Sequence, residues 1–140
     1  MCWKRKKIAK QAETFEITEI ESILLKSMYM RGTFEYEITT LNDEATISKF
    51  RIVYSEGEGR RKLRSSVVLP QKDVLDKIKE FELSSWDGFN GNFPKDVLDG
   101  VSFTFLAIVN NGRRIYANGS ENFPPHYEEF VRWLNEILAD

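Results

Sequence analysis

The sequence contains few of the residues on which enzyme and metal sites most often depend. Among its 140 residues there is one cysteine, Cys2, and one histidine, His126. A single cysteine cannot form an intramolecular disulfide or a cysteine-based metal cluster, which is typical of proteins kept in a reducing compartment. No apolar stretch reaches the roughly 20 residues of a transmembrane helix, and none follows the basic N-terminal residues as in a signal peptide. The sequence therefore predicts a cytoplasmic protein.

Net charge is also small, but it is unevenly distributed along the chain. The formal charge is −2, yet five cations crowd the first ten residues: Lys4, Arg5, Lys6, Lys7 and Lys10. The remainder is mildly acidic, which argues against nucleic-acid binding, because that function needs many cations to neutralise phosphates. We interpret residues 1–12 as a basic flexible arm and residues 13–140 as a single domain of ordinary size, without internal repeats.

Residues 34–69 show the pattern of three consecutive strands. Apolar and polar side chains alternate over 34–39 and again over 49–55, which is typical of strands with one buried face. A loop of residues 42–44 places Tyr36 opposite Phe50 on the core side and Glu37 opposite Lys49 on the solvent side. Opposite charges facing each other across strands support this register by roughly 0.2 to 1 kcal/mol per pair.

The third predicted strand covers residues 61–69, with Leu63, Val67 and Leu69 on one face, and Pro70 ends it. Residues 71–81 have apolar side chains at helical spacing and predict a helix. Residues 17–30 fit both a helix and a strand, and we favour a strand from about 19 to 30 because the next strands need a neighbour.

The last forty residues predict a hairpin and a helix. Residues 101–110 form a strongly apolar strand, and Asn111-Gly112 favours a two-residue turn that pairs Ile108 with Ile115. Apolar residues on both faces predict a central hairpin. Pro124-Pro125 then open an amphipathic helix, which Ser120 or Asn122 is placed to cap.

Together these elements predict an α+β fold. Its antiparallel sheet of about six strands, a meander plus a hairpin, is accompanied by a mid-chain helix and a packed C-terminal amphipathic helix.

Three spaced motifs mark the second half of the chain. They are Trp86-Asp87-Gly88-Phe89, then Leu98-Asp99-Gly100 followed by Phe103, and then Gly119-Ser120 with Asn122-Phe123-Pro124. This series resembles a family of small uncharacterised bacterial proteins with a W-D-G-F loop, a D-G-x-S-F strand start and a G-S-x-N-x-P helix start. The resemblance covers roughly residue 22 to the C-terminus and implies a shared fold, without an activity or a ligand. Glu121 departs from the small residues more usual at its position.

These motifs supply the candidate binding residues. Two aromatic rings beside a carboxylate in a Gly-rich loop suit contact with a ligand or a partner, although the same rings also suit a core. The predicted contact surface comprises Trp86, Asp87, Phe89, Asn90, Asp99, Asn118, Ser120 and Asn122.

No catalytic residue, metal ligand or cofactor is predicted. His126 has no nucleophile with the required motif, since no G-x-S-x-G turn surrounds Ser120. Phe89 and Gly91 occupy positions that a calcium loop needs for ligands.

The leading hypothesis is therefore a non-enzymatic module that binds a protein or a small molecule. The alternatives are a hydrolytic enzyme that uses loop carboxylates and a protein held weakly at a membrane surface by its basic arm.

Overall fold

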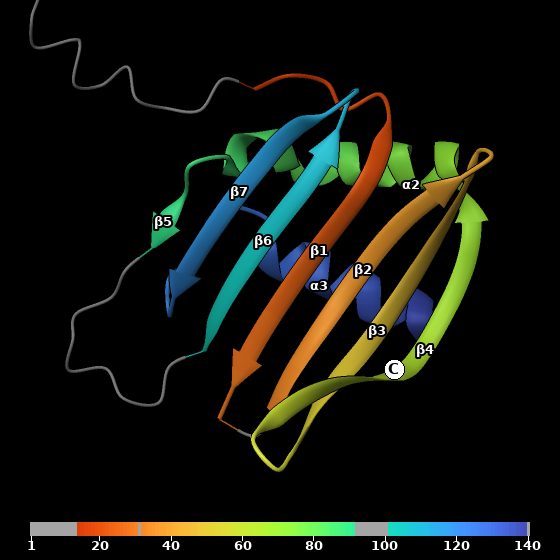
Figure 1. The fold of residues 1–140 in the computed structure, drawn as a ribbon. Helices are drawn as coiled ribbons and strands as arrows, with labels where there is room; N and C mark the ends of the chain where they lie inside the picture. Colours follow the sequence, from red (N-terminus) through yellow and green to blue (C-terminus); the bar gives the residue numbers. More distant parts are fainter. Residues whose placement is uncertain (1–13, 31, 92–100, 140) are drawn as a thin grey trace, which may run out of the picture.

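The computed structural model describes residues 14–30, 32–91 and 101–139, which form one sheet with helices on one of its faces (Figure 1). Seven strands lie in the order β4-β3-β2-β1-β6-β7-β5. They are β1 (Ile20–Tyr29), β2 (Gly32–Leu41), β3 (Glu44–Ser55), β4 (Glu58–Pro70), β5 (Asn90–Gly91), β6 (Ser102–Val109) and β7 (Arg113–Ser120). The helices are α2 (Gln71–Ile78) and α3 (Tyr127–Leu138), with two 3-10 turns, η1 (Lys79–Phe81) and η2 (Leu83–Trp86).

The predicted α+β class is confirmed, with two refinements. Residues 20–29 are strand β1, which settles the ambiguous segment and places the first strand in the middle of the sheet between β2 and β6. The sheet has a seventh strand, because β5 pairs in parallel with β7 over two residues inside the segment predicted to be a loop. The predicted basic arm lies outside the described residues.

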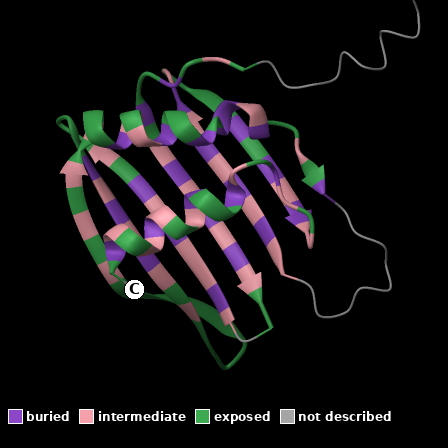
Figure 2. Cartoon of the chain, turned by 180° about the vertical axis from the view of Figure 1, so that it is seen from behind, coloured by how far each residue is buried: buried purple, intermediate pink, exposed green. Residues whose placement is uncertain are grey.

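Both α2 and α3 cover the same face of the sheet (Figure 2). The inward side chains of the central strands form the core with buried residues of both helices, including Val74, Ile78, Phe130 and Leu134. Fully burying a large apolar side chain contributes about 1.5 to 3 kcal/mol before entropy is counted. The predicted amphipathic faces of both helices are therefore confirmed.

The predicted cap of the C-terminal helix is wrong. Residue His126, with a φ of 68°, precedes α3, and no side chain caps the helix. Ser120 is the last residue of β7 and pairs with Ser102. Six residues separate Ser120 from the helix, because the chain must cross from the edge of the sheet to the helical layer.

The predicted register of the first hairpin is wrong by one residue. Tyr36 lies opposite Lys49, not Phe50, because the turn has two residues, Asn42 and Asp43, with φ values of 52° and 65°. Two positive φ values suit the twist of a tight hairpin, and Asn and Asp tolerate them. Lys49 is consequently a buried residue at 8% exposure, and Phe50 points to the opposite face.

A register shift between β3 and β4 places Leu63 on a different face of the sheet from the one predicted. Lys49 lies opposite Ser65 whereas Phe50 lies opposite Leu63, which leaves Arg64 as the extra residue of a bulge. Leu63 is therefore exposed on the open face of the sheet, whereas Val67 and Leu69 pack against the core. The prediction of one shared face is wrong because a bulge reverses the alternation.

The second hairpin also differs from its prediction by one residue. Ala107 pairs with Ile115, and the turn has three residues, all with positive φ, of which Asn110 is the first. The Asn110 carboxamide explains this choice, since its Oδ1 accepts hydrogen bonds from the amides of Thr18 and Glu19. The hairpin is not covered on both faces, because Tyr116 is 48% exposed on the face that carries no helix.

No helix among the described residues is both long and apolar enough to cross a membrane.

Candidate functional site

Trp86 from the predicted contact surface is a core residue. Its side chain is fully buried, and its ring makes edge contacts with Phe105 at 4.8 Å and Phe130 at 5.7 Å between centroids. The indole Nε1 donates a hydrogen bond of 2.9 Å to the carbonyl oxygen of Pro125. The expectation that Trp86 stacks on a ligand is therefore wrong, because the ring joins the sheet to the start of α3.

The neighbours of Trp86 in the motif shape the edge of the sheet. The exposed Asp87 carboxylate accepts a hydrogen bond of 2.9 Å from the amide of Tyr116, so it anchors the loop to β7. Phe89 is half-buried, and its ring lies 6.3 Å from that of Phe103. Asn90 is exposed in β5. The Asp87 carboxylate therefore has a structural partner in the backbone.

The second half of the predicted surface lies beside β5. Asn118 pairs with Asn90, and its amide donates a hydrogen bond of 3.0 Å to the Phe89 carbonyl oxygen. Asn122 is exposed, and its carbonyl oxygen lies 2.7 Å from where a Cβ on Gly91 would be, so only glycine fits there. The structure therefore brings Asn90, Asn118, Ser120 and Asn122 to one edge of the sheet, whereas Asp99 lies outside the described residues.

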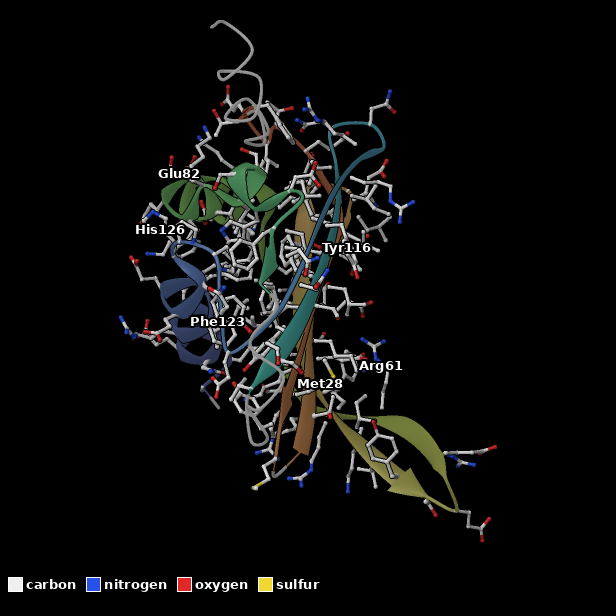
Figure 3. The ribbon with its side chains drawn as sticks, turned by 90° about the vertical axis from the view of Figure 1, so that its left-hand side faces the viewer. Met28, Arg61, Glu82, Tyr116, Phe123 and His126 are labelled. Carbon is white, nitrogen blue, oxygen red and sulfur yellow. The ribbon has the colours of Figure 1, made fainter. Side chains whose placement is uncertain are left out.

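A groove of about 550 Å³ lies along α3, next to this edge. Its apolar walls come from four places in the fold: the end of β1, the start of β6, the turn after β7, and α3 itself. These walls are formed by Tyr29, Val101, Phe123, Tyr127 and Val131. Phe123 projects from the turn toward α3 (Figure 3), and its ring stacks on Tyr127 at 4.6 Å between centroids.

The rim of the groove is charged. It carries Glu121, Glu128, Glu136 and Arg132, which gives a local charge of −2. None of these four side chains forms an ion pair within the described part of the chain. The rim therefore presents its carboxylates to whatever occupies the groove.

Asn135 lines the groove and connects it to the buried Lys49. Its Oδ1 accepts a hydrogen bond of 3.0 Å from the Tyr36 hydroxyl and one of 3.1 Å from Lys49 Nζ. Both donors come from the sheet beneath α3. With its oxygen occupied twice, Asn135 keeps an amide nitrogen that has no acceptor among the described residues. This nitrogen is a donor available at the groove wall.

Tyr127 extends from the groove into the core. Its hydroxyl and the Oγ of Ser27 are both buried, and neither has a hydrogen-bond partner among the described residues. Burial raises the pKa of Tyr127 well above its usual value, an effect that the nearby Ser27 hydroxyl only partly offsets. Burial therefore favours the neutral form of the Tyr127 hydroxyl.

His126 lies at the start of α3, close to Glu82 (Figure 3) and to Glu129. Its Nδ1 is 3.0 Å from Glu129 Oε1, and its Nε2 is 3.4 Å from Glu82 Oε1. The hydrogen bond with Glu129, helped by the negative charges of Glu129 and Glu82, raises the pKa of His126, whereas burial opposes the shift. Through these two contacts His126 links Glu82, the residue before η2, to Glu129 in α3.

The described residues contain no cluster of three or more histidine, cysteine or acidic side chains placed to hold a metal ion. The residues that line the groove were missed by the sequence analysis because each appears ordinary in its own segment. Val101, Glu121 and Phe123 lie within the noted motifs, but none of them was among the predicted binding residues.

Comparison with known proteins identifies no relative of this chain: no family model, no curated protein and no solved structure matches it.

Proposed function

We propose that the protein is a non-enzymatic binding module and that its binding site is the groove along α3. The observation that carries the proposal is the combination of an apolar floor with a charged rim in one concavity of about 550 Å³. Small-molecule sites usually measure about 300 to 1,000 Å³ and combine apolar walls with a few polar groups. The groove therefore suits an amphiphilic ligand of small-molecule size.

The polar groups that line the groove indicate how a ligand would be oriented in it. Three rim glutamates against Arg132 favour a positively charged group at the mouth of the groove. The Asn135 amide favours a hydrogen-bond acceptor at the end nearest Lys49. An apolar middle portion would pack on Val131 and Phe123.

This arrangement keeps part of the sequence-based hypothesis. The turn after β7 contributes Glu121 and Phe123 to the groove. The buried Trp86 does not line the groove but packs against Tyr127, which does.

A titration followed by ¹⁵N NMR tests the site. Phenylbutylamine is the probe, and 5-phenylvalerate, with the same phenylbutyl part and the opposite charge, is the matched probe. We expect the amine to shift the amide signals of Val131, Arg132 and Phe123, and the carboxylate to bind more weakly. Shifts spread over the open face of the sheet, or no shifts near α3, would contradict the proposal.

Two variants sharpen this test. Val131→Arg places a long charged side chain in the groove and should abolish the shifts. Leu75→Arg makes the same change at a half-buried position of α2, away from this groove, and should leave them intact. Circular dichroism of both variants checks that each one is folded.

A further inference from the structure

The hairpin of β3 and β4 projects beyond the rest of the sheet (Figure 3). Pairing between β2 and β3 stops at Thr33 and Ile52, whereas β3 and β4 remain paired as far as Ser55 and Glu58. Between this tip and the adjoining ends of β1 and β2 lies a second groove, of about 390 Å³. It is separate from the α3 groove, although Tyr29 lines both.

Exposed apolar side chains are concentrated at this end of the sheet. The second groove is lined by Tyr29, Met30, Val53 and Tyr54, which are 41%, 75%, 41% and 63% exposed. These are four of the eight large apolar residues that are exposed in the described part of the chain. Single exposed apolar residues need no explanation, but a cluster of this kind marks an interaction surface.

The same hairpin is basic within an acidic protein. Residues 51–64 contain five cations and two carboxylates, Glu56 and Glu58, which gives +3 in a chain of formal charge −2. Arg51 lies directly opposite Lys62, and like charges in such positions disfavour pairing. The hairpin therefore concentrates positive charge that an anionic partner would complement.

Two of the five cations lack carboxylate partners in the described residues. Arg61 is held by Glu35 at 2.8 Å and by Glu37 at 3.4 Å. Arg60 and Lys62 form no ion pair within the described ranges. Arg60 lies three residues after the turn residue Gly57, and Lys62 lies five residues after it. Along an extended strand these separations are about 10 and 17 Å. Arg60 is thus within about one Debye length of anything that the tip touches.

We infer that this end of the sheet docks on an anionic lipid bilayer. Met30 and Val53 enter the boundary of the acyl chains, the tyrosines lie among the headgroups, and Arg60 and Lys62 attract anionic lipids. The aliphatic side chains favour a bilayer over single-stranded nucleic acid, whose bases stack on aromatic rings. This surface lies beyond the proposed ligand groove and does not depend on it.

Sedimentation of the full chain with vesicles tests the inference. Phosphatidylcholine vesicles with and without phosphatidylserine are the probes. We expect binding only when phosphatidylserine is present, and less binding as the salt concentration rises. Absence of binding to the mixed vesicles would overturn the inference, and so would tighter binding to a thymidylate 20-mer than to these vesicles.

A pair of charge variants locates the contact. Arg60→Ser combined with Lys62→Ser should weaken binding about 30-fold, since each cation near the surface contributes about fivefold. Lys72→Ser combined with Arg114→Ser removes the same charge from exposed positions on α2 and β7 and should have little effect. Equal losses in both pairs would mean that only net charge matters, which would overturn the assignment to the hairpin.

A second pair tests the apolar contact. Met30→Ser should weaken binding, whereas Leu41→Ser should not, because Leu41 is equally exposed at 75% but lies at the opposite end of β2. A chain with serine at Lys4, Arg5, Lys6, Lys7 and Lys10 separates the N-terminal cations from the hairpin. If that change abolishes binding while the Met30 and Arg60/Lys62 variants bind normally, the inference is wrong.

Discussion

The indole of Trp86 and the carbonyl of Pro125 are joined by a hydrogen bond of 2.9 Å across the boundary between the sheet and α3. The contact fixes the start of α3, which forms one wall of the candidate groove. The candidate groove therefore depends on Trp86, a side chain that is fully buried.

Replacing Trp86 should destabilise the domain. Trp86→Phe removes the donor to Pro125 and leaves a cavity, which we expect to lower the free energy of unfolding by about 2 kcal/mol. Trp86→Ala should lower it by about 3 to 5 kcal/mol. Urea denaturation followed by circular dichroism measures both. Trp133→Phe, at a half-buried position of α3, is the control and should cost less.

Gly119→Ala should be destabilising through overpacking. A Cβ at this position would overlap the carbonyl oxygen of Asn122 and lie 2.8 Å from Cε1 of Phe103. Forcing these groups apart should cost about 1 to 3 kcal/mol. Ser120→Ala, at the next residue, creates no such overlap and should be close to neutral. Equal thermal midpoints for the two variants would show that the turn can move away from β7.

Asn135 should couple energetically to Tyr36. Asn135→Ala removes the acceptor that Tyr36 and Lys49 share, and we expect a loss of about 1 to 3 kcal/mol. In a double-mutant cycle with Tyr36→Phe, the coupling free energy should be about 0.5 to 1.5 kcal/mol. Glu136→Ala, at the exposed neighbour, should change stability by less than about 0.5 kcal/mol. Strict additivity in the cycle would disprove the contact.

Stability should depend on the protonation of His126. The contacts with Glu129 and Glu82 raise its pKa in the folded state above the ordinary value of 6.5. The stabilisation is therefore complete below the unfolded pKa and is lost as the pH rises through the folded pKa. Thermal midpoints measured from pH 5.5 to 8.5 should fall more for the wild-type protein than for His126→Asn.

The choice of asparagine keeps a residue that tolerates the positive φ of this position. Glu129→Gln should lower the pKa of His126 in an NMR titration. An unchanged pKa would show that the hydrogen bond with Glu129 does not cause the shift.

Much of the secondary structure could be predicted from the sequence. The apolar stripe of residues 127–138 and the alternation in residues 34–39 depend on side chains a few positions apart, and both elements form as expected. Periodicity also predicted α2, where Val74 and Ile78 are buried as one stripe.

Register could not be predicted in the same way, because it depends on a choice between turns of similar length. The alternation around Phe50 is compatible with either face of the sheet. Changing the turn from three residues to two moves each side chain of the strand to the opposite face. Lys49 then lies inside, where its ammonium group is 4.9 Å from the centroid of the Phe34 ring and donates a hydrogen bond to Asn135. A charged residue at a core position is difficult to infer when its acceptor lies 86 residues later in the chain.

The candidate groove could not be predicted from local sequence patterns either. Tyr29, Val101 and Val131 come from three distant segments, and nothing in the sequence around any one of them predicts that they meet. The composition of the W-D-G-F motif suggested that Trp86 contacts a ligand. In the structure Trp86 is instead a buried core residue. The resemblance to a bacterial family stays a prediction.

The strand order has a consequence for the time course of synthesis. Strand β1 leaves the ribosome before the other six strands of the described sheet, but one of its edges pairs with β6, which ends at Val109. Until that residue has been made, β1 to β4 form a meander with one unpaired inner edge, and α3 is still missing from the core. A nascent chain halted before β6 should therefore bind chaperones, and this domain should complete its folding only after α3 has been made.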